Sequence, residues 1–509
     1  MLIHKRPRIN AARRTLANTA HWSFEKSVRK AATMESSEAD LPEEEHPAKS
    51  DSSSQPSKIS RLLRTEFDAK YQIVNLQTPL NAFMSGHYKQ SFAFHTLRSR
   101  LPVVLTNVID TLTRDKTELV AQFASSEFAQ AAREELKIII GLISRLKYEL
   151  QTDKPFHNFT GEEPDRELWN NFISSLPDGE RSFYRASSLH AECYLHRKLQ
   201  SFLENSIFLK SYDYFAKIKE QALTDNMDDV LALTKYTRRS ENSLEVFDEL
   251  LRINMWSNCN DVASDVEIVK QTNRQVLENV AAPDEHVLVN QAAEIWRCLD
   301  NQKPKKQKQV DFILDNAGYE LFSDFILAEF MIEKGLATKV RFHVKAHPWF
   351  VTDVTERDFK WTLEYLSQHA DYIISLIGKK FLQFLDEGKF ELAPISHFWT
   401  SPHAFYSMPH TDPDLYSSLQ SSKLVVFKGE LNYRKLLQDV CWDTTQEMST
   451  CLRGFLPSNI CVLRRVKSEV ISGLAEGVGQ ALSRQDPGWM VSGSYGVIQF
   501  VDGAREFGY

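Results

Sequence analysis

Cysteine pairs, long apolar runs and a strong charge of one sign are all missing from this sequence of 509 residues. Its six cysteines form no CxxC pair and no zinc-type spacing with histidine, and no secretory signal is present, so we expect a reducing, cytoplasmic environment. No window approaches about eighteen consecutive apolar residues, which argues against a transmembrane helix. A formal net charge of -7 gives no general attraction to nucleic acid or to an anionic membrane, so partners must be recognised locally.

The first sixty residues differ in composition from the rest of the chain. Residues 1–30 carry eight Lys and Arg against the single acid Glu25, whereas residues 31–60 carry seven Asp and Glu against two Lys. Because such a segment cannot build a core, we predict a disordered extension over residues 1–75. Its basic, acid-poor start is also typical of a mitochondrial presequence, and the composition leaves this alternative, a mitochondrial protein, open.

Residues 79–298 follow a helical pattern. Apolar residues recur at steps of three and four over residues 136–150, and amphipathic stripes continue over residues 191–203 and 207–218. There is little of the two-residue alternation that strands show. We therefore predict a helical domain over residues 76–302.

One polar pair within this helical region has a spacing found in metal sites. Glu192 and His196 are four residues apart, which can place two ligands on one helix face. A metalloprotease helix, however, needs two histidines with a glutamate between them. A single Glu/His pair is more often a surface contact, and we expect one here.

The pattern changes after a basic cluster at residues 303–308. This cluster resembles a nuclear-localisation signal, which would add a nuclear location, but a solvated linker is the more typical interpretation. Short runs rich in Val, Ile and Phe then alternate with helix-like segments. This alternation predicts an α/β domain over residues 303–509, with a Rossmann-like, mostly parallel sheet flanked by helices. We expect strands at 310–314, 339–344, 372–377, 424–427, 460–463 and 497–501, and helices at 321–331, 356–367 and 432–440.

Polar side chains follow several of these strands. Asp315 and Asn316 come directly after the first strand, and Asp353 follows the second. Arg434 and Lys467 follow two later strands. Because ligands of open α/β sheets bind outside the carboxyl ends of the strands, we expect these side chains to share one site. Oxygen ligands suit Mg²⁺ or Mn²⁺ better than zinc, and Arg and Lys suit a phosphate, so the pattern predicts metal-assisted phosphoryl hydrolysis.

The Asp-Asn-x-Gly sequence at the first strand end has a second interpretation as ordinary turn chemistry, with Gly318 relieving a tight backbone. Spacing alone does not separate the two. Five ordered segments, however, resemble successive motifs of the metal-dependent damage-control phosphatases, also described as acidic-residue (protein-glutamate) methyltransferases. These segments are DNAGYE at 315–320, PWFVTD at 348–353, FWTSP at 398–402, FKGELNYRKL at 427–436 and RRVK at 464–467. Helical segments at 91–103 and 191–194 extend the resemblance over about residues 79–500.

The resemblance implies a role for each matching residue. Metal binding falls to Asp315, Asn316 and Asp353, and Asp315 and Asp353 are also catalytic. The implied metal is Mn²⁺, with Ni²⁺, Co²⁺ or Mg²⁺ as alternatives. The implied substrates are small phosphorylated metabolites, in particular fructose 1-phosphate and fructose 6-phosphate. The residues implied to bind the substrate are Asp315, Asn316, Glu430, Leu431, Asn432, Tyr433, Arg434 and Lys467.

Two departures from the family pattern bear on the substrate. Glu430 stands where the family has Asp, and Arg465 replaces a small hydroxyl residue. We expect these changes to affect substrate preference more than metal binding. Glu320, one helical turn past Asn316, is expected to contact a metal ligand rather than the metal. The attacking group is left open between water and the Asp315 carboxylate.

Two other functions remain as alternatives. The first is an S-adenosylmethionine-dependent methyltransferase that esterifies glutamate side chains, with the DNA sliding clamp as its target. Such an enzyme normally has a glycine-rich turn after its first strand, but the candidate around Gly477 and Gly479 follows a late strand and lacks a third glycine. The second is a non-enzymatic interaction module, against which the intact polar set argues.

Overall fold

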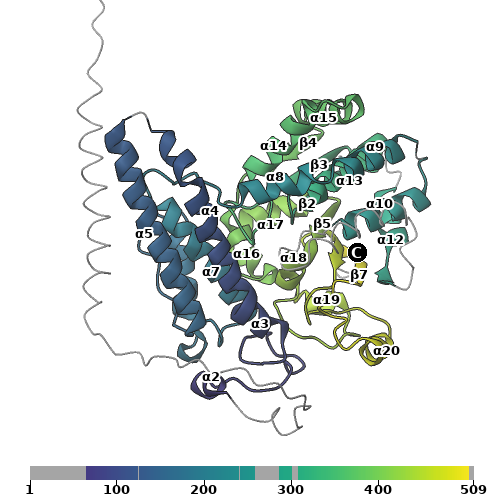
Figure 1. Cartoon of the computed structure of the whole chain (residues 1–509). Helices are drawn as coiled ribbons and strands as arrows, with labels where there is room; N and C mark the ends of the chain where they lie inside the picture. The colour runs from purple at the N-terminus through teal and green to yellow at the C-terminus, as the bar shows by residue number, and fades with distance from the viewer. Residues whose placement is uncertain (1–64, 124, 240, 258–285, 301–307, 504–509) are drawn as a thin grey trace, which may run out of the picture. The chain divides into compact units, whose positions relative to one another are not determined.

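Runs rich in Val, Ile and Phe form the strands of a sheet in the computed structural model of the chain (Figure 1). The structure describes residues 65–123, 125–239, 241–257, 286–300 and 308–503. Within these residues the sheet has seven strands: β1 (Val287–Asn290), β2 (Gln309–Ile313), β3 (Lys339–His343), β4 (Phe390–Leu392), β5 (Leu424–Lys428), β6 (Asn459–Arg465) and β7 (Gly496–Val501).

The strand order β1-β7-β6-β5-β2-β3-β4 contains a switch point between β2 and β5. From β2 the chain moves outward through β3 and β4, and it then returns to β5 and β6 on the other side of β2. Strands β2 to β6 are parallel, whereas β7 is antiparallel to β6 and pairs in parallel with β1. The crevice at the carboxyl ends of β2 and β5 is therefore the expected ligand site of this sheet.

Both faces of the sheet are buried, because alternate side chains of each central strand point to opposite faces. Phe312 of β2 and Val426 of β5 pack on one face, and Ile313 and Val425 pack on the other. The first face is covered by α8 (Ala216–Thr224), α9 (Met227–Arg239), α10 (Leu244–Trp256), α12 (Ala292–Leu299), α13 (Tyr319–Glu333), α14 (Glu356–Ser367) and α15 (Tyr372–Asp386). The second face is covered by η4 (His397–Thr400), η5 (Phe405–Ser407), α16 (Met408–Thr411), α17 (Pro413–Gln420), α18 (Gly429–Leu436) and α19 (Met448–Cys451), while α20 (Val478–Gln485) packs beside β7.

Helices that precede the sheet in the chain form a second core. Figure 1 shows α4, α5 and α7 lying alongside one another. The core of these helices also contains Trp349 and Val351, from the loop after β3, and Leu431 of α18, so the helical region packs directly on the loops at the switch point. The elements of this region are α2 (Glu66–Lys70), α3 (Phe92–His95), the π-turn η1 (Thr96–Arg100), α4 (Leu101–Ala121), α5 (Ser126–Gln151), α6 (Arg166–Ser175), η2 (Asp178–Glu180) and α7 (Ser188–Glu204).

The predicted fold class, an α/β fold with a mostly parallel sheet flanked by helices, is confirmed. The strand predicted at 372–377 is wrong, because these residues begin α15. Asp371 caps this helix by accepting hydrogen bonds from the amides of Ile373 and Ile374. Buried Ile374, Ile377, Phe381 and Phe384 follow at helical spacing. The short apolar run is thus the start of a longer helical pattern.

The predicted boundary at residue 303 cuts through the sheet. Strand β1 lies before it, and helices α8 to α10 and α12 contribute to the core on the first face. The stripe predicted at 207–218 is irregular up to Phe215, the N-cap of α8. Residues 65–75, assigned to the extension, contain α2 and the buried Ile73. The remaining predictions for residues 1–64 and for residues 301–307 of the basic cluster lie outside the described residues.

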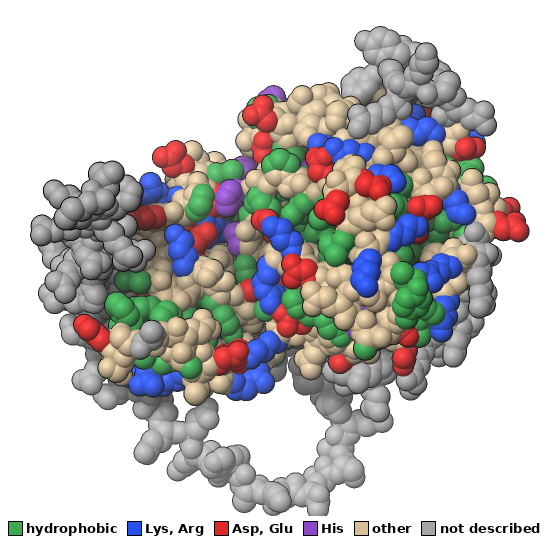
Figure 2. All heavy atoms as spheres, turned by 90° about the horizontal axis from the view of Figure 1, so that it is seen from above, with side chains coloured by type: hydrophobic (Ala, Val, Ile, Leu, Met, Phe, Trp, Pro, Cys, Tyr) green, Lys and Arg blue, Asp and Glu red, His purple; other side chains and the backbone are tan. Residues whose placement is uncertain are grey.

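Charged side chains of both signs lie on the surface of the described residues. Acidic and basic side chains are interspersed over the face shown in Figure 2. Among the helices that the structure describes, none is long and apolar enough to cross a membrane.

Candidate active site

Two loops at the carboxyl ends of β2 and β3 are joined through their backbones. The amide of Val354 donates to the carbonyl of Asp315 at 2.9 Å, and the amide of Ala317 donates to the carbonyl of Thr352 at 2.8 Å. Asn316 and Asp353 therefore face each other as an isolated antiparallel bridge. The three predicted metal ligands are thus held together by backbone hydrogen bonds.

Side-chain hydrogen bonds further fix Asn316. Its Nδ2 donates to Oδ2 of Asp315 and to Oε2 of Glu320, both at 2.9 Å. Its Oδ1 accepts from the hydroxyl of Thr352 at 2.5 Å. Glu320 thus contacts a predicted metal ligand, as expected.

Four carboxylates and two lysines form a buried cluster around this point. Lys345 lies 3.2 Å from Oδ2 of Asp353 and donates to the Leu314 carbonyl, and Lys428 lies 3.3 Å from Glu320 and 3.0 Å from Asp324. The acids are Asp315, Glu320, Asp324 and Asp353, and all are less than a tenth exposed. Four negative and two positive charges leave a formal charge of about -2 when all groups are ionised.

The pKa values reflect this excess of negative charge. Burial, followed by repulsion from Glu320 and Asp353, raises the pKa of Asp315 well above its ordinary value. Burial also raises the pKa of Asp353 to about 6, although Lys345 opposes the shift. The pKa of Asp324 is raised to about 6 by burial, with Lys428 opposing.

A divalent cation fits this donor set. Oδ2 of Asp353 is buried and accepts no hydrogen bond from the described residues, although Lys345 is close to it. Adding two positive charges would cancel the formal excess, and oxygen donors favour Mg²⁺ or Mn²⁺. No group of three His, Cys, Asp or Glu in the described part of the chain has ligand geometry by itself. The candidate set therefore depends on the Asn316 amide as well as on Asp315 and Asp353.

The turn after β5 closes on the same point. Gly429 has φ +78°, and a Cβ there would lie 1.7 Å from Oδ2 of Asp315, so only glycine permits this approach. In the following helix, Nδ2 of Asn432 donates to the carbonyls of Ile313 and Leu314 at 3.2 and 3.3 Å. These contacts lock α18 against the end of β2.

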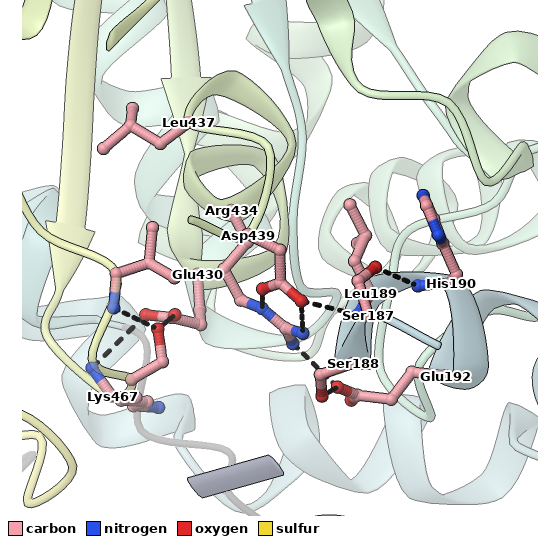
Figure 3. A network of polar contacts seen from close by, with 12 residues as sticks. Ser187, Ser188, Leu189, His190, Glu192, Glu430, Arg434, Leu437, Asp439 and Lys467 are labelled. Atoms are coloured by element: carbon pink, nitrogen blue, oxygen red, sulfur yellow. Dashed lines mark hydrogen bonds and ion pairs between the residues drawn. The ribbon is translucent and has the colours of Figure 1, made fainter. Parts of the chain in front are cut away.

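Arg434 of α18 is buried between two carboxylates (Figure 3). Its Nε and Nη2 donate to Asp439 at 2.7 and 3.2 Å, and its Nη1 lies 2.9 Å from Glu192 of α7. Glu430, seen on the other side of Arg434 in Figure 3, accepts hydrogen bonds from Arg464 at 2.7 and 3.1 Å and from the Lys467 amide at 3.2 Å. Asp439 and Glu192 thus fix the position of Arg434, and Glu430 fixes the positions of Arg464 and of the Lys467 backbone.

One cavity of about 90 Å³ is lined by most of the predicted site residues. The predicted residues that line it are Asp315, Asn316, Asp353, Glu430, Leu431, Arg434 and Lys467. The helical region completes the wall with Arg100, Glu192 and His196. His196 stacks on Phe350, with ring centroids 4.6 Å apart. The loop that carries Phe350 is strained, because Phe350 and Val351 have φ values of +43° and +73°, a region that β-branched valine rarely adopts.

Two predicted substrate-binding residues do not line this cavity. Asn432 binds backbone carbonyls, and the hydroxyl of the fully buried Tyr433 accepts a hydrogen bond from the Ser472 amide. Arg465 also points elsewhere: its guanidinium donates to the Gly493 carbonyl and lies over the Trp256 ring. Arg465 does not line the cavity, since alternate residues of β6 point to opposite faces, and its expected effect on substrate preference stays a prediction.

The surface contact expected for Glu192 and His196 is also wrong. Both side chains are buried and line the cavity. Arg100, like Glu192 and His196, lines the cavity from the helical region. The sequence alone gives no indication of a role for it. Arg100 is the last residue of the π-turn η1, and such turns are often found at functional sites, but this one is visible only in the structure.

The fold and the site define a class: an α/β enzyme with a buried carboxylate cluster and cationic side chains at the switch point of its sheet. Residues 96–482 match the model of the damage-control phosphatase ARMT1-like domain, and the chain belongs to this family. The predicted membership is thus confirmed, and it supports phosphatase activity on small metabolites.

Relatives of this chain match over most of their length. The damage-control phosphatase ARMT1 of Danio rerio is 36% identical over 445 residues, which cover 83% of this chain and 97% of that protein. The protein of the same name from Homo sapiens is 33% identical over 441 residues, which cover 82% and 98%. A solved DUF89 family protein from Pyrococcus horikoshii covers 77% of this chain and 97% of its own, with 13% identity and a TM-score of 0.35, a likeness too weak to support an argument.

Proposed function

We propose that this protein is a metal-dependent phosphatase of sugar phosphates, with fructose 1-phosphate and fructose 6-phosphate as substrates. The observation that carries the proposal is the shared cavity, which is lined by Asp315 and Asp353 and also by Arg434 and Lys467. The carboxylates suit a cation, and the cationic side chains suit a phosphate.

Asp315, Asp353 and Asn316 would hold the metal, which we propose to be Mn²⁺, with Ni²⁺, Co²⁺ or Mg²⁺ as alternatives. A bound metal supplies Lewis-acid polarisation of a phosphoryl oxygen. Asp315 is kept in place by Asn316 and by the close approach of Gly429, so its carboxylate needs little reorganisation.

The other groups act on the substrate itself. Arg434 and Lys467 bind the phosphate and stabilise the charge that develops during an in-line displacement. Glu430 and Leu431 line the cavity beside them, and Glu430 is oriented by Arg464. The displacement is started either by a water molecule or by the Asp315 carboxylate. Rapid acid quench of the reaction with ³²P-labelled substrate separates the two, because only carboxylate attack leaves label on the protein.

The experiment that tests this function compares two reactions of the purified protein. One sample receives fructose 1-phosphate or fructose 6-phosphate with Mn²⁺, and the other receives labelled S-adenosylmethionine and DNA sliding clamp. We expect phosphate release that stops when a chelator removes the metal and returns when Mn²⁺ is added back. Methyl transfer without phosphate release, or neither reaction, would overturn the proposal.

A further inference from the structure

Arg434 is held from two directions by acids that are far apart in the sequence. Asp439, five residues later, accepts two nearly parallel hydrogen bonds from Nε and Nη2, which fix the plane of the guanidinium. Glu192, in α7 of the helical region, lies 2.9 Å from Nη1. Figure 3 shows the guanidinium between these two carboxylates.

Both acids are themselves anchored to the start of α7. Asp439 has a left-handed backbone with φ +61°, and its Oδ2 accepts a hydrogen bond from the Leu189 amide at 2.7 Å. Ser188 donates its hydroxyl to Oε1 of Glu192 at 2.8 Å. The orientation of Arg434 is therefore coupled to the first turn of α7.

A second buried arginine shows which part of this arrangement is special. Arg197 is also held by two acids, Asp165 through its Nε at 2.9 and 3.0 Å and Glu204 at 2.8 Å. That cluster does not line the cavity, so an arginine between two acids is a structural device in this fold. The difference at Arg434 is that both Arg434 and Glu192 line the cavity with Asp315 and Asp353.

We propose that Glu192 and Asp439 are positioning residues that aim Arg434 at the phosphate of the substrate. This inference rests on the proposed phosphatase function. Asp439 accepts hydrogen bonds from two of the five guanidinium N–H groups, and Glu192 holds Nη1 close to α7. The remaining N–H groups then have a fixed direction in which to donate to a phosphate oxygen. The binding site for the phosphate is thus completed by the helical region.

The test is Glu192→Gln, which keeps the shape of the side chain and removes its charge. We expect KM for fructose 1-phosphate to rise about tenfold or more, because Arg434 is no longer aligned and its charge-assisted contact with the phosphate is lost. The inhibition constant of inorganic phosphate should rise in parallel. The rise in Tm caused by Mn²⁺ should stay unchanged, since the metal ligands are untouched. Asp439→Asn, which retains an oxygen for the Leu189 amide, should act in the same direction.

The matched control is Glu204→Gln, which removes one acid from the Arg197 cluster. Glu204→Gln should lower Tm by about as much as Glu192→Gln does. The inhibition constant of inorganic phosphate should stay at the wild-type value. An unchanged or lower phosphate inhibition constant in both Glu192→Gln and Asp439→Asn, with a folded protein by circular dichroism, would overturn the inference.

Failure of the proposed function gives a different result. In that case the wild type releases no phosphate from sugar phosphates, and calorimetric titration with inorganic phosphate then decides about positioning by itself. Weaker phosphate binding by Glu192→Gln than by Glu204→Gln supports it, and equal binding contradicts it.

Discussion

At the scale of single residues, the site gathers buried carboxylates that repel one another, and this repulsion lowers the stability of the folded protein. Asp315 is buried beside Glu320 and Asp353, and this repulsion raises its pKa. Such an arrangement disfavours the folded protein unless a cation is present, as is common where function needs a strained or charged site. Removing one of these charges should therefore stabilise the protein while it abolishes activity.

We predict this outcome for Asp315→Asn, which preserves the size of the side chain. Hydrolysis should fall by at least about a hundredfold, because a group that orients the reacting centre is lost. Tm measured in a chelator should equal or exceed that of the wild type, and the rise in Tm on adding Mn²⁺ should disappear. Differential scanning calorimetry with and without Mn²⁺ measures both effects. Wild-type turnover by this variant would sink the assignment of the site.

The close approach of Gly429 to Asp315 gives a second prediction. Gly429→Ala should reduce kcat by about a hundredfold, because its Cβ would occupy the position of the Asp315 carboxylate. Gly454→Ala is the matched control, since Gly454 has a similar φ of +83° and its Cβ would meet no atom of the described residues within 4 Å. Gly454→Ala should lose about 1 kcal/mol of stability to backbone strain, and Gly429→Ala should lose more because its Cβ also clashes with Asp315. Equal kcat values for the two would show that the approach has no catalytic importance.

At the scale of the element, β2 carries different chemistry on its two sides. Asp311 points away from the site and accepts hydrogen bonds from Arg341 at 2.6 and 3.1 Å and from His343 at 3.0 Å. Burial opposes ionisation of this carboxyl, but His343 and Arg341 outweigh it and bring the pKa to about 2. These contacts join β2 to β3 beneath the loops that carry Asp315 and Asp353.

The sign of the pH dependence follows from this lowered pKa. The unfolded carboxyl titrates near pKa 3.9, so its stabilising contribution is complete above about pH 4 and is lost as the pH falls through 2. We predict that Asp311→Asn lowers the free energy of unfolding by about 2 kcal/mol at pH 7, and that this deficit is about halved at pH 3. Urea unfolding at both pH values measures it. Glu391→Gln, which breaks the partly exposed pair with Lys339, should cost less than about 1 kcal/mol, and an equal cost for the two would contradict the argument.

Elements are predictable from the sequence where one pattern dominates. Strand β2 and helix α14 are placed to within a residue or two, because a buried strand and a capped amphipathic helix leave clear local signals. Strands β1 and β4, with four and three residues, carry too little signal. In the site, Asp315 and Asp353 are visible as strand-end acids. Glu192 is not, because its burial depends on packing between helices and loops that are distant in sequence.

At the scale of the whole molecule, the site depends on parts on both sides of the basic cluster. Lys428 of β5 donates to the carbonyl of Asn254 in α10 at 3.1 Å, and Nδ2 of Asn254 donates to Asp324 at 2.7 Å. Helix α10 therefore hydrogen-bonds two members of the buried cluster, Lys428 and Asp324. On the opposite side, Glu192 of α7 reaches the cavity itself. Neither contribution lies within the range 303–509.

This dependence gives a prediction about fragments. A fragment of residues 303–509 would expose the sheet face that α8 to α10 and α12 cover, leave β7 without its neighbour β1, and bury Lys428 without Asn254. We expect it to be insoluble or to lack a cooperative thermal transition, because unsatisfied buried groups and exposed apolar surface both disfavour folding. A protein of residues 64–509 should unfold cooperatively and release phosphate from fructose 1-phosphate at the full-length rate. A cooperatively folded 303–509 fragment that binds Mn²⁺ would show instead that the carboxylate cluster is assembled without any of the helices and the strand β1 that precede residue 303.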